Sequence, residues 1–266
     1  MKNKKLTILV SSFDGYSDIW PSFEKIFKNN WSDCEYPIKI TSNFLECNGL
    51  ETIKTGEEIN WSTRMIKAIE SIDSDYVLLL LEDYLIGKKV DSNKFDSIVN
   101  KIVKEEIDYF RLTNFPKSKN SKAIEEYAPI YQDEEYGINL QAAIWKVSYL
   151  KKVLHKYSGN AWKFEIGLLS ETVDAPHKAI PGCYTMLNDP LCILNGVLKG
   201  KWFPSTIKFF KKQGIIIDSS HRGMLSFLEV LKYESIQFVK NKVSSKMRKK
   251  MKKIALKLGF KFMSEY

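Results

Sequence analysis

Two acidic residues follow the most apolar run of the chain. Val77 to Leu81 are five consecutive aliphatic residues, and Glu82 and Asp83 come next. A run without helical or alternating periodicity predicts a strand that is buried on both faces of a largely parallel sheet. Ligands of open α/β sheets bind at the carboxyl ends of strands. We therefore expect Glu82 to lie near a bound phosphate and Asp83 to bind Mn²⁺ or Mg²⁺, which prefer oxygen ligands. The alternative is that both acids simply end the strand and face water.

The segment before this strand gives the acids a context. It contains, in order, a glycine turn, a predicted helix with small residues, the apolar strand and the acids: Gly56, Trp61, Ser62, Arg64, Ala68 and Asp83. This order resembles the nucleotide-sugar half of GT-A glycosyltransferases, in which the metal-binding acidic motif follows such a strand. The resemblance covers roughly residues 1–100. It departs from the family at Leu81, where the first acid of an Asp-any-Asp motif would stand if Asp83 were the last.

The resemblance implies a donor site at the end of the first predicted strand, Leu6 to Ser12. In GT-A enzymes the loop after this strand holds the base and ribose of the nucleotide. Ser12 and Asp14 are accordingly the residues that we expect to bind the substrate here. Asp18 either contributes to the same site or caps the helix that follows, and Gly15 can serve a turn.

Arg64 falls in the first turn of a helix predicted from Ser62 to about Ile72. Asn60 or Ser62 can cap this helix. A cation is unfavourable at a helix amino terminus. We therefore expect Arg64 to bind the anionic nucleotide, although an exposed arginine paired with an acid is the competing interpretation.

Trp162 and Glu165 form a second candidate pair, at a predicted helix start in the later half of the chain. In inverting GT-A enzymes an acid in such a place, often near a tryptophan, deprotonates the acceptor hydroxyl. The resemblance implies this general-base role for Glu165, and Trp162 could stack on a sugar ring. Alternatively, the helix dipole favours a glutamate here and Trp162 belongs to the core. Glu171 and Asp174 are the reserve candidates.

The rest of the pattern supplies the elements that would position these residues. Alternation and apolar runs predict further strands at 36–42, 51–54 and 108–112, and helices up to 29, at 91–106 and at 148–157. Asn195-Gly196 between apolar pairs predicts a hairpin or a strand bend. The fold class expected is α/β, a Rossmann-like GT-A domain with a mostly parallel central sheet flanked by helices, over residues 1–218.

Composition narrows the class of protein. The 266 residues are 44% hydrophobic and 27% charged, as in an ordinary soluble globular protein. The four cysteines contain no C-x-x-C pair and the three histidines no H-E-x-x-H pattern, so neither a zinc site nor a redox motif is indicated. No spanning segment or signal peptide is recognisable, which favours a cytoplasmic protein.

The positive charge is concentrated near the end of the chain. Residues 240–262 contain nine lysines and Arg248 without an acid, so this segment carries +10 of a net charge of +9 and the remainder carries −1. A nearly neutral body argues against binding of nucleic acid there. The apolar spacing within 219–266 predicts a basic amphipathic helix, and we expect residues 236–266 to bind an anionic membrane surface. A solvated helix packed on the domain and RNA binding are the alternatives.

These features together predict a glycosyltransferase, peripherally bound to the inner face of the plasma membrane. It would transfer a sugar from a nucleotide sugar to a saccharide acceptor, lipid-linked and part of a bacterial capsule or lipopolysaccharide, with inversion. One alternative is a sugar-phosphate nucleotidyltransferase, which should have a glycine-rich basic loop after the first strand where this chain has Ser-Ser-Phe-Asp-Gly-Tyr. The other is a non-catalytic membrane-binding or nucleic-acid-binding protein.

Overall fold

The computed structural model describes residues 5–57, 60–118, 126–170, 175 and 178–242. The chain forms two compact units, residues 1–223 and residues 224–266. The division falls five residues beyond the boundary expected after residue 218. The two units are described separately below.

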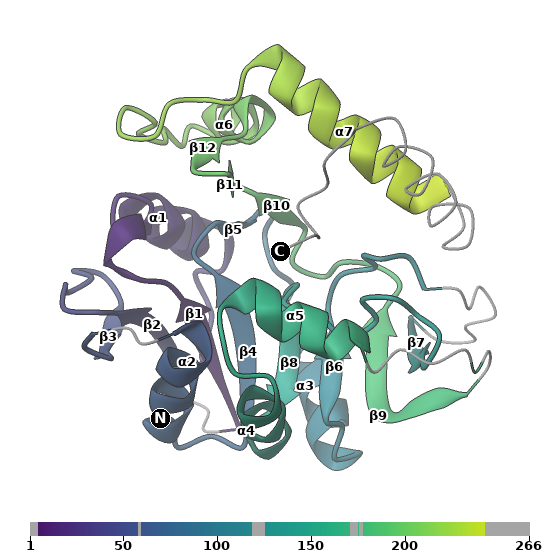
Figure 1. The fold of residues 1–266 in the computed structure, drawn as a ribbon. Coiled ribbons are helices and arrows are strands. Elements are labelled where there is room, and N and C mark those ends of the chain that lie inside the picture. The colour runs from purple at the N-terminus through teal and green to yellow at the C-terminus, as the bar shows by residue number, and fades with distance from the viewer. Residues whose placement is uncertain (1–4, 58–59, 119–125, 171–174, 176–177, 243–266) are drawn as a thin grey trace. The chain divides into compact units, whose positions relative to one another are not determined.

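The first unit is built on a sheet of eight strands (Figure 1). Its strand order is β3-β2-β1-β4-β8-β6-β9-β7. The strands are β1 (Leu6–Ser11), β2 (Ile38–Ser42), β3 (Glu51–Lys54), β4 (Tyr76–Leu81), β6 (Tyr109–Arg111), β7 (Tyr127–Tyr131), β8 (Ala143–Lys146) and β9 (Ala179–Met186). The strands predicted from the sequence at 6–12, 36–42, 51–54 and 108–112, together with the apolar strand before Glu82, all form within this sheet.

The sheet is mostly parallel. β1 is parallel to β2 and β4, and β2 is parallel to β3. β8 runs antiparallel to both β4 and β6, while β9 runs parallel to β6 and antiparallel to β7. Six strands therefore point one way, and only β7 and β8 oppose them. This mixed, mostly parallel sheet confirms the fold class expected from the sequence.

Helices cover both faces of the sheet (Figure 1). They are α1 (Trp20–Asn30), α2 (Trp61–Glu70), α3 (Ser92–Lys104), α4 (Val147–Lys156) and α5 (Ala161–Ser170), and α6 (Pro204–Lys212) is a further helix of the same unit. The side chains of Leu6, Ile8 and Val10 share one core with α1 and α3. Leu9 lies in a second core with α2, α4 and α5.

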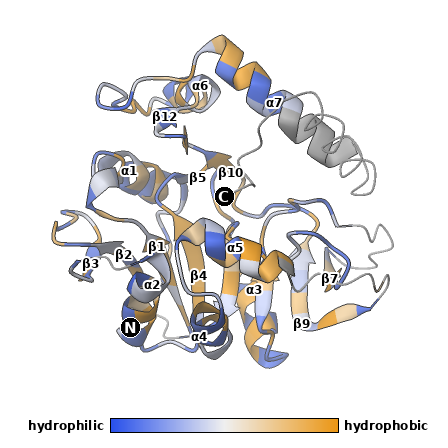
Figure 2. Cartoon of the chain, in the orientation of Figure 1, coloured by the Kyte–Doolittle hydropathy of each residue, from blue (hydrophilic) through white to orange (hydrophobic). Residues whose placement is uncertain are grey.

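The run that precedes the acids is the centre of this arrangement. Val77 and Leu79 belong to one core, Leu78 and Leu80 to the other, and all four are at most 1% exposed. Figure 2 shows β4 in the hydrophobic colour along its length. Full burial of one aliphatic side chain contributes about 1.5–3 kcal/mol. The absence of periodicity in the sequence thus has a physical reason, since both faces of β4 are buried.

Short strands beyond the main sheet adjust one prediction. β5 (Tyr84–Ile86) pairs with β10 (Ile193–Asn195), and β11 (Val197–Leu198) pairs with β12 (Lys201–Trp202), both antiparallel. Asn195-Gly196 therefore joins strands of two different sheets. It is the strand bend and not the hairpin of the two predicted possibilities.

The second unit is described from residue 224 to residue 242 and contains α7 (Phe227–Lys242). Ser226 and Glu229 cap its start reciprocally: the Ser226 N–H donates to Glu229 Oε2 (2.8 Å), and the Glu229 N–H donates to Ser226 Oγ (3.3 Å). Most of the predicted basic helix, residues 243–266, lies outside the described residues. In the described part of the chain, no helix combines the length and apolar character that crossing a membrane requires.

Candidate functional site

The sheet places the two acids where its strand order changes direction. β2 lies on one side of β1 and β4 on the other, so the switch point lies between β1 and β4. Ser11 pairs with Leu81 at the carboxyl ends of these strands. Such a point leaves a crevice for ligands outside the strand ends. Glu82 and Asp83 follow β4 directly into this position.

Both acids are held in an environment that disfavours their charge. Glu82 is only 8% exposed, and its pKa is raised to about 8 because burial penalises the carboxylate and Asp83 adds a like charge. Burial raises the pKa of Asp83 to about 6. The N–H of Val197 donates to Asp83 Oδ2 (3.3 Å). A pair of this kind gains from a nearby cation. Glu82 is buried and so does not face water, as the alternative predicted, whereas Asp83 is partly exposed.

The acids fit Mn²⁺ or Mg²⁺ only together with a substrate. In the described residues, no group of three or more His, Cys, Asp and Glu side chains is arranged to hold a metal ion. Mg²⁺ is commonly bound by one or two carboxylates with substrate phosphates and water. Asp83, with Glu82 beside it, matches that kind of shared site, and the metal role of Asp83 stays a prediction.

Arg64 lies beside the acids. It is 6% exposed, so the interpretation as an exposed surface arginine is wrong. Its guanidinium lies 5.6 Å from the ring centroid of Phe13, and its positive charge lowers the pKa of Glu82. Asn60 caps α2, because its Oδ1 accepts the Thr63 N–H (3.0 Å). Arg64, the fourth residue of α2, is thereby placed near the loop after β1 through Phe13 and near the acid after β4 through Glu82.

A second arginine at the site, Arg222, was not anticipated. It forms a two-point ion pair with Asp18, with Nε to Oδ2 and Nη2 to Oδ1 both 2.7 Å, and Nη2 also donates to the Gly15 carbonyl. Its guanidinium carbon lies 4.0 Å from the ring centroid of Tyr16. Arg222 also lowers the pKa of Glu82 and of Asp83. Asp18 is thus an ion-pair partner and does not cap α1.

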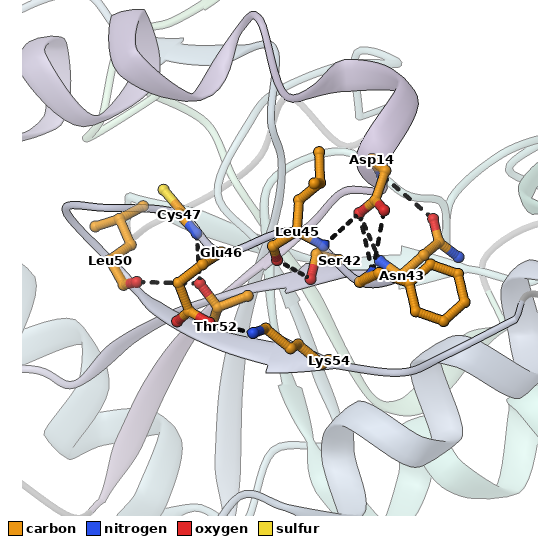
Figure 3. Close-up of polar contacts among 10 residues, drawn as sticks. Asp14, Ser42, Asn43, Leu45, Glu46, Cys47, Leu50, Thr52 and Lys54 are labelled. Carbon is orange, nitrogen blue, oxygen red and sulfur yellow. Dashed lines mark hydrogen bonds and ion pairs between the residues drawn. The ribbon is translucent and has the colours of Figure 1, made fainter.

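Asp14 and Ser12 both form hydrogen bonds within the protein, and Figure 3 shows those of Asp14. The Asp14 carboxylate accepts backbone N–H groups of Asn43 (2.9 Å), Phe44 (3.1 Å) and Leu45 (3.3 Å). Ser12 Oγ accepts the indole N–H of Trp20 (2.8 Å). The Asp14 bonds join the loops after β1 and β2, and the Ser12 bond joins the loop after β1 to α1. A contact of Ser12 or Asp14 with a nucleotide stays a prediction.

Glu165 projects from the middle of α5, not from its start. Asn160 caps this helix through a bond from the Lys163 N–H (2.8 Å), and Glu165 is the fifth helical residue. The prediction of a helix-start glutamate is therefore wrong. Glu165 Oε1 accepts the N–H of Leu140 (2.9 Å).

Tyr84 is affected electrostatically by Glu165 and by both acids, Glu82 and Asp83. The charges of Asp83, Glu165 and Glu82 all raise the pKa of Tyr84, on top of the larger effect of its burial. The three carboxylates therefore lie within electrostatic reach of one side chain. Trp162, one turn before Glu165, is 43% exposed, so it is not the core residue of the alternative interpretation. Glu171 and Asp174 lie outside the described residues.

Comparisons with known proteins return distant structures. No protein-family model and no curated protein sequence matches the chain. Residues 1–349 of TarS from S. aureus share 11% identity at a TM-score of 0.41, over 68% of this chain and 60% of that one. A cytidylyltransferase from Leptospira borgpetersenii shares 10% identity at 0.42, over 91% and 99%. The galactosyltransferase LgtC, in complex with donor and acceptor sugar analogs, shares 13% identity at 0.40, over 77% and 78%.

The chain spans less than two thirds of the TarS fragment. Structural similarity at this distance does not assign an activity to this protein. The class of protein follows from the chain's own topology. A parallel half in the order β3-β2-β1-β4, an antiparallel neighbour β8 and an acid pair directly after β4 agree with the GT-A type that the sequence resembles. The protein has a GT-A-type α/β fold.

Proposed function

We propose that this protein is an inverting glycosyltransferase that moves a sugar from a nucleotide-sugar donor to a saccharide acceptor. The proposal rests on one arrangement of charged side chains. Glu82 and Asp83 lie at the switch point, and the charge of Arg64 acts on Glu82. Glu165 acts electrostatically on Tyr84, as the two acids do. A nucleotide sugar needs a cationic place for its diphosphate and a base for the incoming hydroxyl. These residues supply both.

The donor side would bind the diphosphate at the carboxyl ends of β1 and β4. Arg64 is buried there and its charge acts on Glu82. Its guanidinium would bind a phosphate oxygen through a charge-assisted hydrogen bond. Mn²⁺ or Mg²⁺, if bound, would be held by Asp83 and would stabilise the charge of the leaving nucleotide. Glu82 would lie near the same phosphate.

The acceptor side would be served by Glu165. The bond from the Leu140 N–H orients the Glu165 carboxylate, and a carboxylate held in this way can act as a general base toward a sugar hydroxyl. Glu165 would take the proton of that hydroxyl as it attacks the anomeric carbon from the face opposite the departing nucleotide. Displacement from the opposite face inverts the anomeric configuration. Trp162, exposed on the same helix, would pack against the acceptor.

The acceptor in this proposal is lipid-linked and belongs to a capsule or lipopolysaccharide. The support is the charge of residues 240–262, which is +10. Each cation near an anionic leaflet contributes about 1 kcal/mol. Residues 236–266 would hold the enzyme at the cytoplasmic face of the plasma membrane, where such acceptors are presented.

The products of the reaction test this proposal. We would incubate the protein with UDP-, GDP-, CMP- or dTDP-sugars and membrane lipid extract, and analyse the released nucleotide. A glycosyltransferase releases the free nucleotide of one donor and labels the lipid fraction with its sugar. In a second incubation, with nucleoside triphosphates and sugar phosphates in place of the nucleotide sugars, a nucleotidyltransferase would instead form a nucleotide sugar and release pyrophosphate. Pyrophosphate release, without sugar transfer from any donor, would overturn the proposal in favour of that activity.

A further inference from the structure

Two exposed aromatic residues stand on loops next to the candidate base. Phe115 lies on the loop after β6, and Tyr136 lies on the loop between β7 and β8. Each is 36% exposed. Large rings with this exposure contribute less to the core than a buried ring would, and exposed aromatics on ordered loops are common at binding surfaces.

Two buried polar side chains fasten these loops to each other. The guanidinium of Arg111, 0% exposed, donates to the carbonyls of Gly137 (2.8 Å), Tyr136 (3.2 Å) and Pro116 (2.9 Å). Asn139 Nδ2 donates to the carbonyls of Tyr136 (2.9 Å) and Phe115 (3.4 Å). The backbones of residues 115 and 136 therefore share one donor nitrogen and lie close together. A buried cation that is hydrogen-bonded in this way holds a fixed geometry.

Tyr136 adopts a backbone conformation that suits glycine better. Its φ is +59°, in the left-handed region, where a bulky side chain is strained. Such strain persists only where the surrounding structure enforces it. The Arg111 and Asn139 bonds to the Tyr136 carbonyl hold this conformation.

The same loop also holds the candidate base. Asn139 is followed by Leu140, whose N–H donates to Glu165 Oε1 (2.9 Å). Gln141 Nε2 then donates to the hydroxyl of Tyr84 (3.2 Å). The Arg111 and Asn139 bonds thus position Phe115, Tyr136 and Glu165 together.

We infer that Phe115 and Tyr136 form the surface that binds the sugar rings of the acceptor, next to Glu165. This inference rests on the proposed function and names the residues on the acceptor side. The ring faces of a saccharide are apolar at their C–H groups, and its hydroxyls bind polar atoms. Exposed aromatic side chains on loops whose backbone also orients a carboxylate match both features. Arg111 and Asn139 are positioning residues for this surface.

The test uses the full chain on an array of immobilised mono-, di- and trisaccharides, which needs no donor. Wild type should bind at least one saccharide, and Phe115→Ala and Tyr136→Gly should each weaken that binding by roughly three- to tenfold, the range of one aromatic contact. Phe209→Ala is the matched control, because Phe209 is 37% exposed on α6. Tyr136→Phe and Phe115→Tyr, which keep the rings, should restore binding.

Thermal unfolding separates binding from folding. Glycine adopts a φ of +59° without strain, so Tyr136→Gly should unfold within a few degrees of wild type while it loses saccharide binding. The inference is overturned if wild type binds no saccharide, or if Phe115→Ala and Tyr136→Gly bind as Phe209→Ala does. Calorimetric titration of nucleotide sugars into wild type is the parallel measurement. If wild type binds a saccharide but no nucleotide sugar, the proposed function is contradicted and the saccharide surface is not.

Discussion

Glu165 is the side chain for which the structure gives the most specific expectation. Its carboxylate is oriented by the Leu140 N–H, and glutamine keeps the shape and hydrogen-bonding atoms but cannot act as a base. Glu165→Gln should therefore lower the rate of sugar transfer by roughly two to four powers of ten, the usual contribution of general acid–base catalysis. The affinity for the donor should barely change. Single-turnover transfer and calorimetry measure the two quantities.

The stereochemistry of the product gives an independent check on Glu165. Proton NMR of the product distinguishes the two anomers. A product that retains the configuration of the donor, or a mutant that transfers at nearly the wild-type rate, would remove Glu165 from the base role.

Glu82 makes stability depend on pH. The pKa of Glu82 is about 8 in the folded protein and lies above its ordinary value of 4.5. Between these two pH values the folded protein keeps the Glu82 proton and the unfolded chain has lost it. The stabilisation from this proton is complete below about pH 4.5 and is lost as the pH rises through about 8. Glu82→Gln should flatten the decline in unfolding free energy between pH 5 and 8.5, measured with urea in the presence of EDTA. The exposed control Glu51→Gln should keep the wild-type slope, and an equal slope in Glu82→Gln would show that Glu82 is not the cause.

The sequence predicts those residues of the candidate site that lie in or next to a strongly patterned element, and it misses those that only a long-range contact brings there. Glu82, Asp83 and Arg64 are recognisable because each stands next to a strand or helix whose own pattern is strong. Arg222 reaches Asp18 across 204 residues of sequence, and no local spacing records that contact. Glu165 was placed in the right helix but on the wrong turn, because Asn160 caps α5 earlier than expected.

At the scale of elements, Asp14 and Asn43 fasten three loops of the sheet. Asn43 Nδ2 donates to the Gly56 carbonyl (3.0 Å), and Asn43 Oδ1 accepts the Asp14 N–H (3.2 Å), so the loops after β1, β2 and β3 meet at one residue (Figure 3). Asp14→Ala would leave three backbone N–H groups without their acceptor and should lower the free energy of unfolding by about 1–3 kcal/mol. Urea unfolding measures this loss. Asp33→Ala, at an exposed acid, is the control, and equal stability of the two variants would show that the bonds of Asp14 contribute little.

The elements that the sequence predicts well are those with complete local signals. β3 forms over Glu51–Lys54 as predicted, and Asp91 caps α3 by accepting the Lys94 N–H (3.0 Å). β7 and β9 were not predicted. β7 contains Pro129, and β9 contains Pro181 and Gly182, residues that argue against a strand from sequence alone. The pairing of β9 with both β6 and β7 compensates for that weakness.

At the scale of the whole molecule, the basic end of the chain should be separable from the first unit. Deletion of residues 236–266 should leave a folded protein that binds anionic phosphatidylglycerol vesicles more weakly, and high salt should reproduce the loss for the full chain because exposed charges are screened. Co-sedimentation with vesicles measures the binding. Replacing Lys249, Lys250, Lys252 and Lys253 with glutamine is the charge control. Vesicle binding that survives the deletion would contradict a membrane role for this segment.

The measurement that bears most directly on the account is calorimetric titration of donors into wild type and Asp83→Asn. The account predicts that at least one of the UDP-, GDP-, CMP- and dTDP-sugars binds wild type, more tightly with Mn²⁺ or Mg²⁺ than with a chelator. It predicts that Asp83→Asn remains folded and loses this metal-dependent gain, while Glu165→Gln retains it. If no nucleotide sugar binds wild type, or if neither Asp83→Asn nor the chelator changes the affinity, the switch-point acids are not the donor site described here.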